Sequence, residues 1–237
     1  MVKLDPRRAI RKYDHTYPTG KKHLFRVRHK TSDTDILNQV DDYFRHVSDF
    51  TGDTVLDIGG HIGGFTVGAI LHGASKVYTV EPTPTALDVL EKNIAGFEDK
   101  VTLYEGAVVG HRQSPTVTLL INKGLATGRN STDVFGTYTI LKKNQIRHKV
   151  KAIDARKLYG YVRPTVIKLD CEGAEYDILL NGPDIPNSVH TVIMELHHRG
   201  HSDNERGQIE FLFRGWEAVK PDSDIMESSE HIYVYRR

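Results

Sequence analysis

Five short apolar runs are spaced along the chain, and stretches of helical length separate most of them. The runs are rich in β-branched and aromatic side chains, which is typical of buried strands in a parallel sheet. Strands that alternate with helices favour an α/β fold with right-handed crossovers. The predicted strands are residues 54–58, 76–81, 101–104, 165–170 and 189–196.

Apolar residues at helical spacing mark the segments around these runs. Between residues 35 and 50, side chains such as Leu37, Val40 and Phe44 recur every three or four positions, so they share one helix face. Ser32 or Asp33 is a suitable N-cap, and we expect this helix to cover one edge of the sheet. Further helices are predicted at residues 65–71, 86–94, 174–180 and 209–213, with a closing hairpin at 216–219 and 231–235.

Residues 110–164 interrupt the alternation. Runs of β character at 116–121, 134–140 and 149–153 have no clear helix between them, so we interpret the region as a β-rich insertion between the third and fourth strands. Its polar, glycine-rich middle, residues 122–132, is either functional, in which case we favour a substrate lid, or simply mobile. The predicted organisation is an N-terminal part, residues 1–50, followed by one α/β domain, residues 51–237.

The N-terminal part is strongly basic. Residues 1–30 contain ten lysines and arginines against two aspartates. Such a stretch is usually a solvated arm, and the alternative is a surface for an anionic acceptor or a partner. Tyr13, Tyr17 and Phe25 within it are interpreted as surface aromatics.

Composition narrows the classes of function. A chain of 237 residues, 38% hydrophobic and with a net charge of +1, can bury one core and has no global attraction to nucleic acid or anionic membranes. It contains neither a run of the roughly 18 apolar residues that a membrane helix needs nor the apolar segment of a signal peptide. A single cysteine, Cys171, excludes an internal disulfide. We therefore expect a cytoplasmic protein with no membrane insertion.

The glycine-rich turn after the first strand carries the strongest chemical signal. Its pattern, Asp57-x-Gly59-x-x-x-Gly63, has an acid inside the motif and differs from the G-x-G-x-x-G of dinucleotide-binding turns. This order suits a ligand with an ammonium group and no pyrophosphate, such as S-adenosylmethionine. Glu81 ends the next predicted strand, where a carboxylate can accept both ribose hydroxyls.

Together with residues 80–82 and 167–175 (Ile-Lys-Leu-Asp-Cys-Glu-Gly-Ala-Glu), this turn makes the chain resemble the FkbM-type methyltransferases. Residues 31–33 and 194–197 fit the same pattern. The resemblance implies a Rossmann-like class I methyltransferase fold, with a mostly parallel seven-stranded sheet, helices on both faces and a final antiparallel strand. It also implies O-methylation of glycans or secondary metabolites. His61 stands where the family more often has Asn, and both side chains can donate a hydrogen bond.

Ligands of open α/β sheets bind at the carboxyl ends of the strands. Four of the five predicted ends carry a carboxylate, which is costly to bury without a partner or a ligand. Capping of the following helices is the alternative explanation. The candidate cofactor-binding residues are Asp57, Gly59, Gly60, His61, Gly63, Phe65, Thr66, Glu81, Pro82, Gly106, Ala107 and Asp170.

Methyl transfer from a sulfonium needs positioning and a group that accepts the hydroxyl proton. His197 is the first candidate base, because a neutral imidazole is available near pH 7. Asp170 is the second, and Glu172 completes the candidate catalytic set. Alternatively, a divalent cation such as Mg²⁺ or Mn²⁺, held by Asp170, Glu195 and His197, lowers the pKa of the hydroxyl.

Three other functions remain as alternatives to an O-methyltransferase of sugar, glycan or small-molecule hydroxyls. The basic N-terminal part favours an RNA methyltransferase. However, the chain lacks an Asn/Asp-Pro-Pro-aromatic motif after Asp170 and has no lysine between Asp170 and Glu195 for a Lys-Asp-Lys-Glu arrangement. A nicotinamide-dependent oxidoreductase fits Glu81 but not the glycine pattern. A non-catalytic nucleotide-binding module would bind the cofactor without turnover.

Overall fold

The computed structural model describes residues 10–111, 113–122, 131–133, 145–197, 201–219 and 232–237. Its main sheet has seven strands, which are β3 (Thr54–Ile58), β4 (Lys76–Glu81), β5 (Val101–Glu105), β10 (Val166–Leu169), β11 (Thr191–Glu195), β12 (Glu217–Val219) and β13 (Ile232–Arg236). They lie in the order β12-β13-β11-β10-β3-β4-β5. Strand β13 is antiparallel to both of its neighbours, β11 and β12, and all other pairs in this sheet are parallel. The predicted class I methyltransferase fold, with its mostly parallel sheet and closing hairpin, is confirmed.

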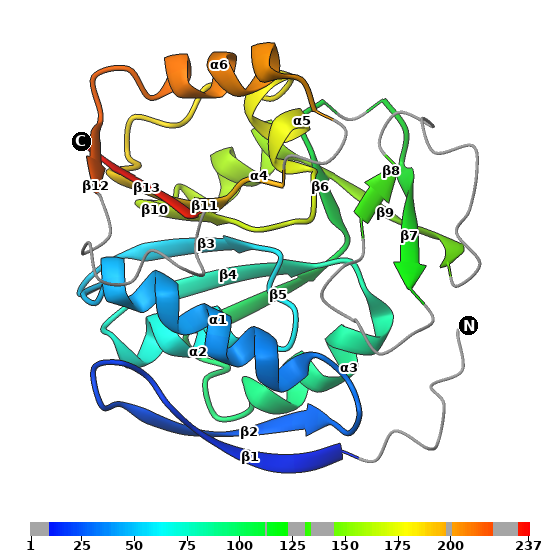
Figure 1. Cartoon of the computed structure of the whole chain (residues 1–237), viewed down its shortest axis with the longest axis vertical. Helices are drawn as coiled ribbons and strands as arrows, with labels where there is room; N and C mark the ends of the chain where they lie inside the picture. Colours follow the sequence, from blue (N-terminus) through cyan, green and yellow to red (C-terminus); the bar gives the residue numbers. More distant parts are fainter. Residues whose placement is uncertain (1–9, 112, 123–130, 134–144, 198–200, 220–231) are drawn as a thin grey trace.

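Helices cover both faces of this sheet, as predicted (Figure 1). One face carries α1 (Asp33–His46), α2 (Gly64–Leu71) and α3 (Pro84–Asn93), and the other carries α4 (Ala155–Val162), α5 (Glu175–Leu180) and α6 (Asp203–Leu212). Because side chains alternate along a strand, β3 sends Val55 into one apolar core and Leu56 into the other. No helix in the described part of the chain is long and apolar enough to cross a membrane.

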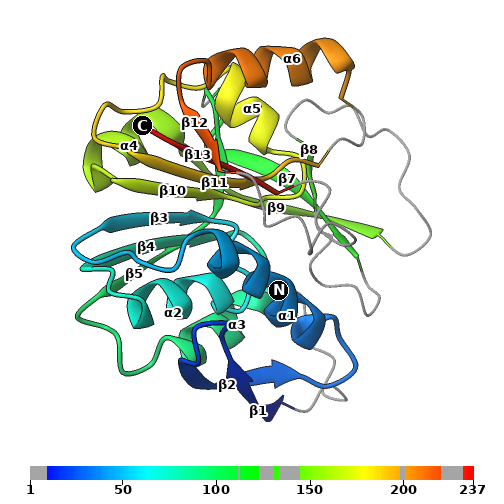
Figure 2. The same cartoon turned by 60° about the vertical axis from the view of Figure 1, so that its left-hand side comes forward.

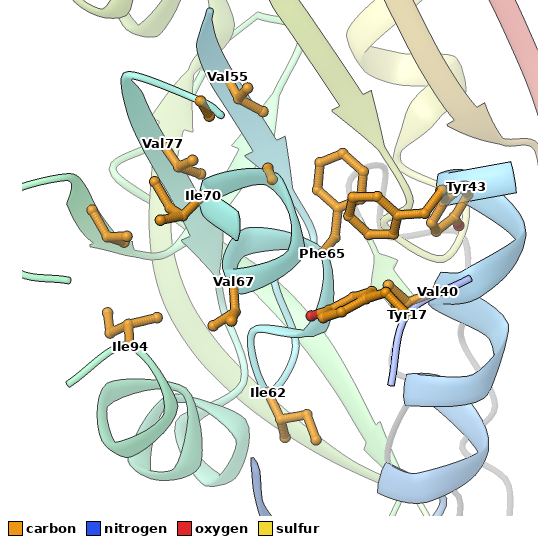
Figure 3. Packing of buried hydrophobic residues seen from close by; sticks show 14 of the residues in the cluster. Tyr17, Val40, Tyr43, Val55, Ile62, Phe65, Val67, Ile70, Val77 and Ile94 are labelled. Atoms are coloured by element: carbon orange, nitrogen blue, oxygen red, sulfur yellow. The ribbon is translucent and has the colours of Figure 1, made fainter. Parts of the chain in front are cut away.

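The core between α1, α2 and the sheet is built around Phe65. Its ring lies 5.4 Å from that of Phe44 and 5.9 Å from those of Tyr43 and Phe50, measured between centroids. Figure 3 shows Phe65 directed from the start of α2 toward Tyr43 on α1. Helix α1 packs against α2 and β2 (Lys22–Arg28), and Tyr43 reaches residues at the ends of the central strands β10 and β11. The expectation that this helix covers a sheet edge is therefore wrong.

The N-terminal segment is also part of this core. Strands β1 (Ile10–Thr16) and β2 form an antiparallel hairpin beside α1 and α3 (Figure 2). Tyr17 and Phe25 are 1% and 0% exposed, and the Tyr17 hydroxyl donates to the Gly64 carbonyl at 2.7 Å. The interpretation of a solvated arm with surface aromatics is wrong here, because basic residues such as Lys12 and Arg26 alternate with inward-facing ones. Residues 1–9 lie outside the described part.

A second sheet, formed mainly by the predicted insertion, stands beside the first (Figure 2). It contains β6 (Ala107–Val109), β7 (Thr116–Asn122), β8 (Ser131–Asp133) and β9 (Gln145–Asp154), in the order β6-β9-β7-β8. The β-rich character is confirmed, but α4 is a helix where none was expected. Its signal was Asp154, an N-cap whose carboxylate accepts the Lys157 N–H at 3.0 Å. The predicted strand at 134–140 and most of the predicted lid fall outside the described residues.

Two helical glycines give a matched test of the packing. A methyl group at Gly68 of α2 would lie 2.2 Å from Cζ of Phe44, whereas a methyl group at Gly160 of α4 would meet nothing within 4 Å. We expect Gly68→Ala to destabilise the protein by about 1–3 kcal/mol through overpacking, and Gly160→Ala to stabilise it by about 0.5–1 kcal/mol through helix propensity. Urea unfolding measures both values. Equal effects would contradict this account of the α1–α2 contact.

Candidate functional site

The glycine turn between β3 and α2 crosses the end of β10. Gly59 has φ +92°, and a Cβ atom there would lie 1.7 Å from the carbonyl oxygen of Asp170. The backbone N–H groups of Gly59 and Gly60 both donate to the Val80 carbonyl, at 2.9 and 3.0 Å. Because only glycine allows this approach, the turn brings the ends of β3, β4 and β10 together.

Glu81 lies directly beside this turn, as the sequence predicts. Its side chain is 5% exposed and accepts the backbone N–H of His61 at 2.9 Å and that of Thr83 at 2.7 Å. Burial raises the pKa of Glu81, and these hydrogen bonds only partly oppose the rise. The turn thus holds a carboxylate at the place expected for the ribose.

Asp57 is buried at the end of β3 and shares its charge with Lys168. Thr66 donates to one Asp57 oxygen at 2.6 Å, and Lys168 Nζ lies 3.2 Å from the other. The same ammonium donates to the Gly59 carbonyl at 2.8 Å and lies 3.4 Å from Asp170. Burial lowers the pKa of Lys168, but the charges of Asp57 and Asp170 outweigh it and raise the pKa above its usual value. The sequence reasoning missed Lys168, whose signal was a lysine inside an apolar strand.

Acidic groups from the ends of β10 and β11 meet next to the turn. The hydroxyl of Tyr43 donates to Asp170 at 3.1 Å and to Glu195 at 3.2 Å. Burial raises the pKa of Asp170, but Lys168 and His197 reverse this and hold it below its ordinary value. Tyr43 belongs to α1, so nothing in the sequence pattern around the motifs pointed to it.

His197 lies among these carboxylates. Its Nδ1 is 3.1 Å from the fully buried Glu175, and its Nε2 is 3.7 Å from both Glu172 and Glu195. Burial lowers the pKa of His197, but Glu175, Asp170 and Glu172 raise it to about 10. The imidazole is therefore charged at neutral pH, which differs from the neutral base that the sequence suggested.

Glu172 has the most unusual backbone and titration of the group. Its φ is +56°, in the left-handed region that a glutamate rarely adopts. Burial raises its pKa, and His197 opposes this rise. The charges of Asp170, Glu175 and Glu195 add to it, and the resulting pKa is about 8. Glu172 therefore titrates close to physiological pH, as a general base must.

The side chains of this cluster that could hold a cation differ in part from those predicted. Ligand atoms of Asp170, Glu175 and His197 lie within 4.8 Å of one another. Glu175 already accepts the N–H groups of Cys171 at 2.6 Å and Gly173 at 2.8 Å, so it holds the loop and orients His197. The signal for Glu175 was the last acid of the Asp-x-Glu-Gly-x-Glu run.

The remaining predicted residues fall into two groups. Phe65 and Thr66 are 2% and 0% exposed and belong to the core and to the Asp57 contact. Gly60, His61 and Gly63 lie in the turn. Pro82 follows β4, Gly106 follows β5, and Ala107 is the first residue of β6. Residues 198–200, directly after His197, fall outside the described part of the chain.

Comparisons with known proteins give one family. The model of the methyltransferase FkbM domain matches residues 57–229. No curated protein matches the sequence.

Solved structures with a similar arrangement include an FkbM methyltransferase from Methylobacillus flagellatus, with 15% identity and a TM-score of 0.47. The alignment covers 78% of this chain, which spans only 44% of that protein. A putative tRNA (m1A22) methyltransferase from Streptococcus pneumoniae, solved with S-adenosyl-L-methionine, has 12% identity, a TM-score of 0.47 and coverage of 85% and 72%. A putative RNA methyltransferase from Pyrococcus horikoshii has 16% identity, a TM-score of 0.44 and coverage of 91% and 87%.

The family match covers most of the chain and includes both the glycine turn and the acidic strand ends described above. It confirms the expected FkbM methyltransferase family. The chain belongs to the FkbM methyltransferase family.

Proposed function

We propose that the protein is an O-methyltransferase that transfers the methyl group of S-adenosylmethionine to a hydroxyl of a sugar, glycan or small molecule. The observation that carries this proposal is the contact between the glycine turn and the end of β10. Gly59 and the Asp170 carbonyl touch. We expect the turn to hold the methyl donor and the acids to face the acceptor, so the two binding sites would lie side by side at the ends of β3 and β10.

In this proposal the turn and Glu81 hold the cofactor. Glu81, fixed by two backbone N–H groups, keeps further lone pairs for the ribose hydroxyls. The glycines allow the turn to approach the methionine part of the cofactor closely. Asp57 supports the turn through Lys168 and Thr66, because its side chain is completely buried.

The acceptor oxygen forms a bond to the methyl carbon while the bond from carbon to sulfur breaks, which leaves S-adenosylhomocysteine. Positioning in line can supply ~7–11 kcal/mol at best. The hydroxyl proton passes to a carboxylate, because His197 is charged at neutral pH. We assign this role to Glu172, whose pKa of about 8 suits a general base. The charged His197 stabilises the ionised carboxylates of Glu172 and Glu195.

A divalent cation is a separate part of the proposal. Asp170, Glu195 and His197 offer two carboxylates and an imidazole, a donor set that suits Mg²⁺ or Mn²⁺. Such an ion would displace the His197 proton and lower the pKa of a bound hydroxyl. The fit is partial, since Nδ1 is already paired with Glu175 and only Nε2 faces Glu172 and Glu195.

A nucleic-acid acceptor is less well supported. The acceptor side carries the carboxyl groups of Asp170, Glu172 and Glu195, and the ionised Asp170 would repel a phosphodiester backbone. The lysines and arginines of β1 and β2 are exposed on the hairpin, except for Arg28, which is paired with Asp33. A neutral polyhydroxyl acceptor therefore suits the described site better.

We expect methyl transfer to at least one neutral glycan or small-molecule hydroxyl when radiolabelled S-adenosylmethionine is incubated with an acceptor panel. RNA of mixed sequence serves as the competing acceptor, and each reaction is run with and without a chelator. Loss of activity with the chelator, restored by Mg²⁺ or Mn²⁺, supports the cation. Transfer to RNA alone would contradict the proposed acceptor, and cofactor binding without any transfer would support a non-catalytic module.

We expect kcat of the wild-type protein to rise with pH through about 8, because the base must be ionised, and to fall near pH 10, where His197 loses its proton. Glu172→Gln should lower kcat by about 10²–10⁴-fold and abolish the rise with pH. Glu210→Gln, on the exposed side of α6, is the matched control and should change neither. An unchanged pH profile in the Glu172 variant would assign the proton to another group.

A further inference from the structure

We propose that the N-terminal segment, residues 10–46, is a positioning element of the methyl-transfer site, although it precedes the matched family domain. It holds the glycine turn through Arg28 and Asp33, and it holds the acids of β10 and β11 through Tyr43. The second contact rests on the proposed function, and the first depends only on cofactor binding.

The first contact starts from a buried ion pair at the junction of β2 and α1. Arg28 and Asp33 are 2% and 0% exposed. Two guanidinium N–H groups donate to the two Asp33 oxygens at 2.6 and 3.0 Å, and the backbone N–H of Arg28 adds a third bond at 2.7 Å. A pair this deeply buried is costly unless its geometry is good. Its bidentate arrangement fixes the direction of the Arg28 side chain.

Arg28 is directed at the glycine turn. Its Nη2 lies 3.2 Å from Nε2 of His61, a residue of the turn with φ +47°. Burial and the Arg28 charge lower the pKa of His61 to about 4, so the neutral imidazole accepts this hydrogen bond. The backbone N–H of His61 donates in turn to Glu81 at 2.9 Å. One chain of contacts therefore runs from Asp33 through Arg28 and His61 to the carboxylate expected at the ribose.

Hydrogen bonds of Asn93 also link the hairpin to Ile62, the next residue of the turn. The Asn93 side chain, at the end of α3, pairs with the backbone of Arg26, accepting its N–H at 2.6 Å and donating to its carbonyl at 3.0 Å. The same amide donates to the Ile62 carbonyl at 2.8 Å. Because His61 adopts a conformation that is unfavourable for a non-glycine residue, the turn needs such external support to keep one shape.

The contact through Tyr43 reaches the acceptor side. Tyr43 is 2% exposed, and its single hydroxyl proton is shared between Asp170 and Glu195 at 3.1 and 3.2 Å. Two carboxylates at the ends of neighbouring strands repel each other, so a donor between them fixes their separation. Helix α1 thus sets the geometry of the two strand ends against which the acceptor is expected to bind.

The contact of Tyr43 is tested with the acceptor identified in the panel. We expect Tyr43→Phe to lower kcat about tenfold or more while the Kd for S-adenosylhomocysteine stays unchanged. Thr165→Val removes a hydroxyl that donates to Asp53 at 2.7 Å, at the opposite, amino ends of β3 and β10, and should leave kcat unchanged. Equal kcat values for the Tyr43 variant and the wild type would overturn this part.

The contact of Arg28 and Asp33 is tested without any acceptor, by calorimetric titration with S-adenosylhomocysteine. We expect Asp33→Asn to raise the Kd about tenfold. Asp177→Asn is the matched control. Asp177 is 6% exposed on α5 and pairs with Gly110 and Asn181, so its loss should lower the melting temperature without changing the Kd.

A double variant, Arg28→Met with Asp33→Asn, separates positioning from stability. It leaves no unpaired buried charge, so it should unfold at a higher temperature than Asp33→Asn alone. If the pair positions the turn, the weak binding persists despite this recovery. An unchanged Kd in both variants, or a Kd that recovers together with the melting temperature, would overturn the proposal. Neither result depends on which acceptor the enzyme methylates.

Discussion

The site depends on one buried ammonium group. Lys168 lies between Asp57 and Asp170 and also holds the carbonyl of Gly59. Without this charge, two carboxylates would face each other at adjoining strand ends, with little water to separate them. Lys168 allows β3 and β10 to end in acids side by side, and it draws the glycine turn down onto the sheet. The cofactor side and the acceptor side are therefore linked through a single side chain.

Strand alternation and local motifs made most of the fold predictable from the sequence. Short apolar runs separated by helices predict that β3, β4, β5, β10 and β11 are parallel. Gly59 and Glu81 lie where the glycine motif predicts them. The N-terminal hairpin was not predictable in the same way. Its basic composition obscured a period-two pattern in which Phe25 and Val27 face the core while Arg26 faces solvent.

The chemistry of the site was harder to predict because it depends on contacts between distant parts of the chain. His197 lies within a few ångströms of Glu172, Glu175 and Glu195. The charges of Glu175, Asp170 and Glu172 outweigh burial and raise its pKa to about 10. No local pattern encodes that sum. Tyr43 and Arg28 reach the site from elements that lack any catalytic motif, so only the folded arrangement reveals them.

The left-handed backbone of Glu172 has a consequence for how the protein can change. A glycine or an asparagine would adopt φ +56° with less strain. Selection for stability alone would therefore favour one of these two residues. In the proposed mechanism, a long acidic side chain at this position costs some stability and supplies the base. Variants that gain heat resistance by replacing Glu172 should emerge readily from a stability screen, and the same variants would be the first to lose turnover.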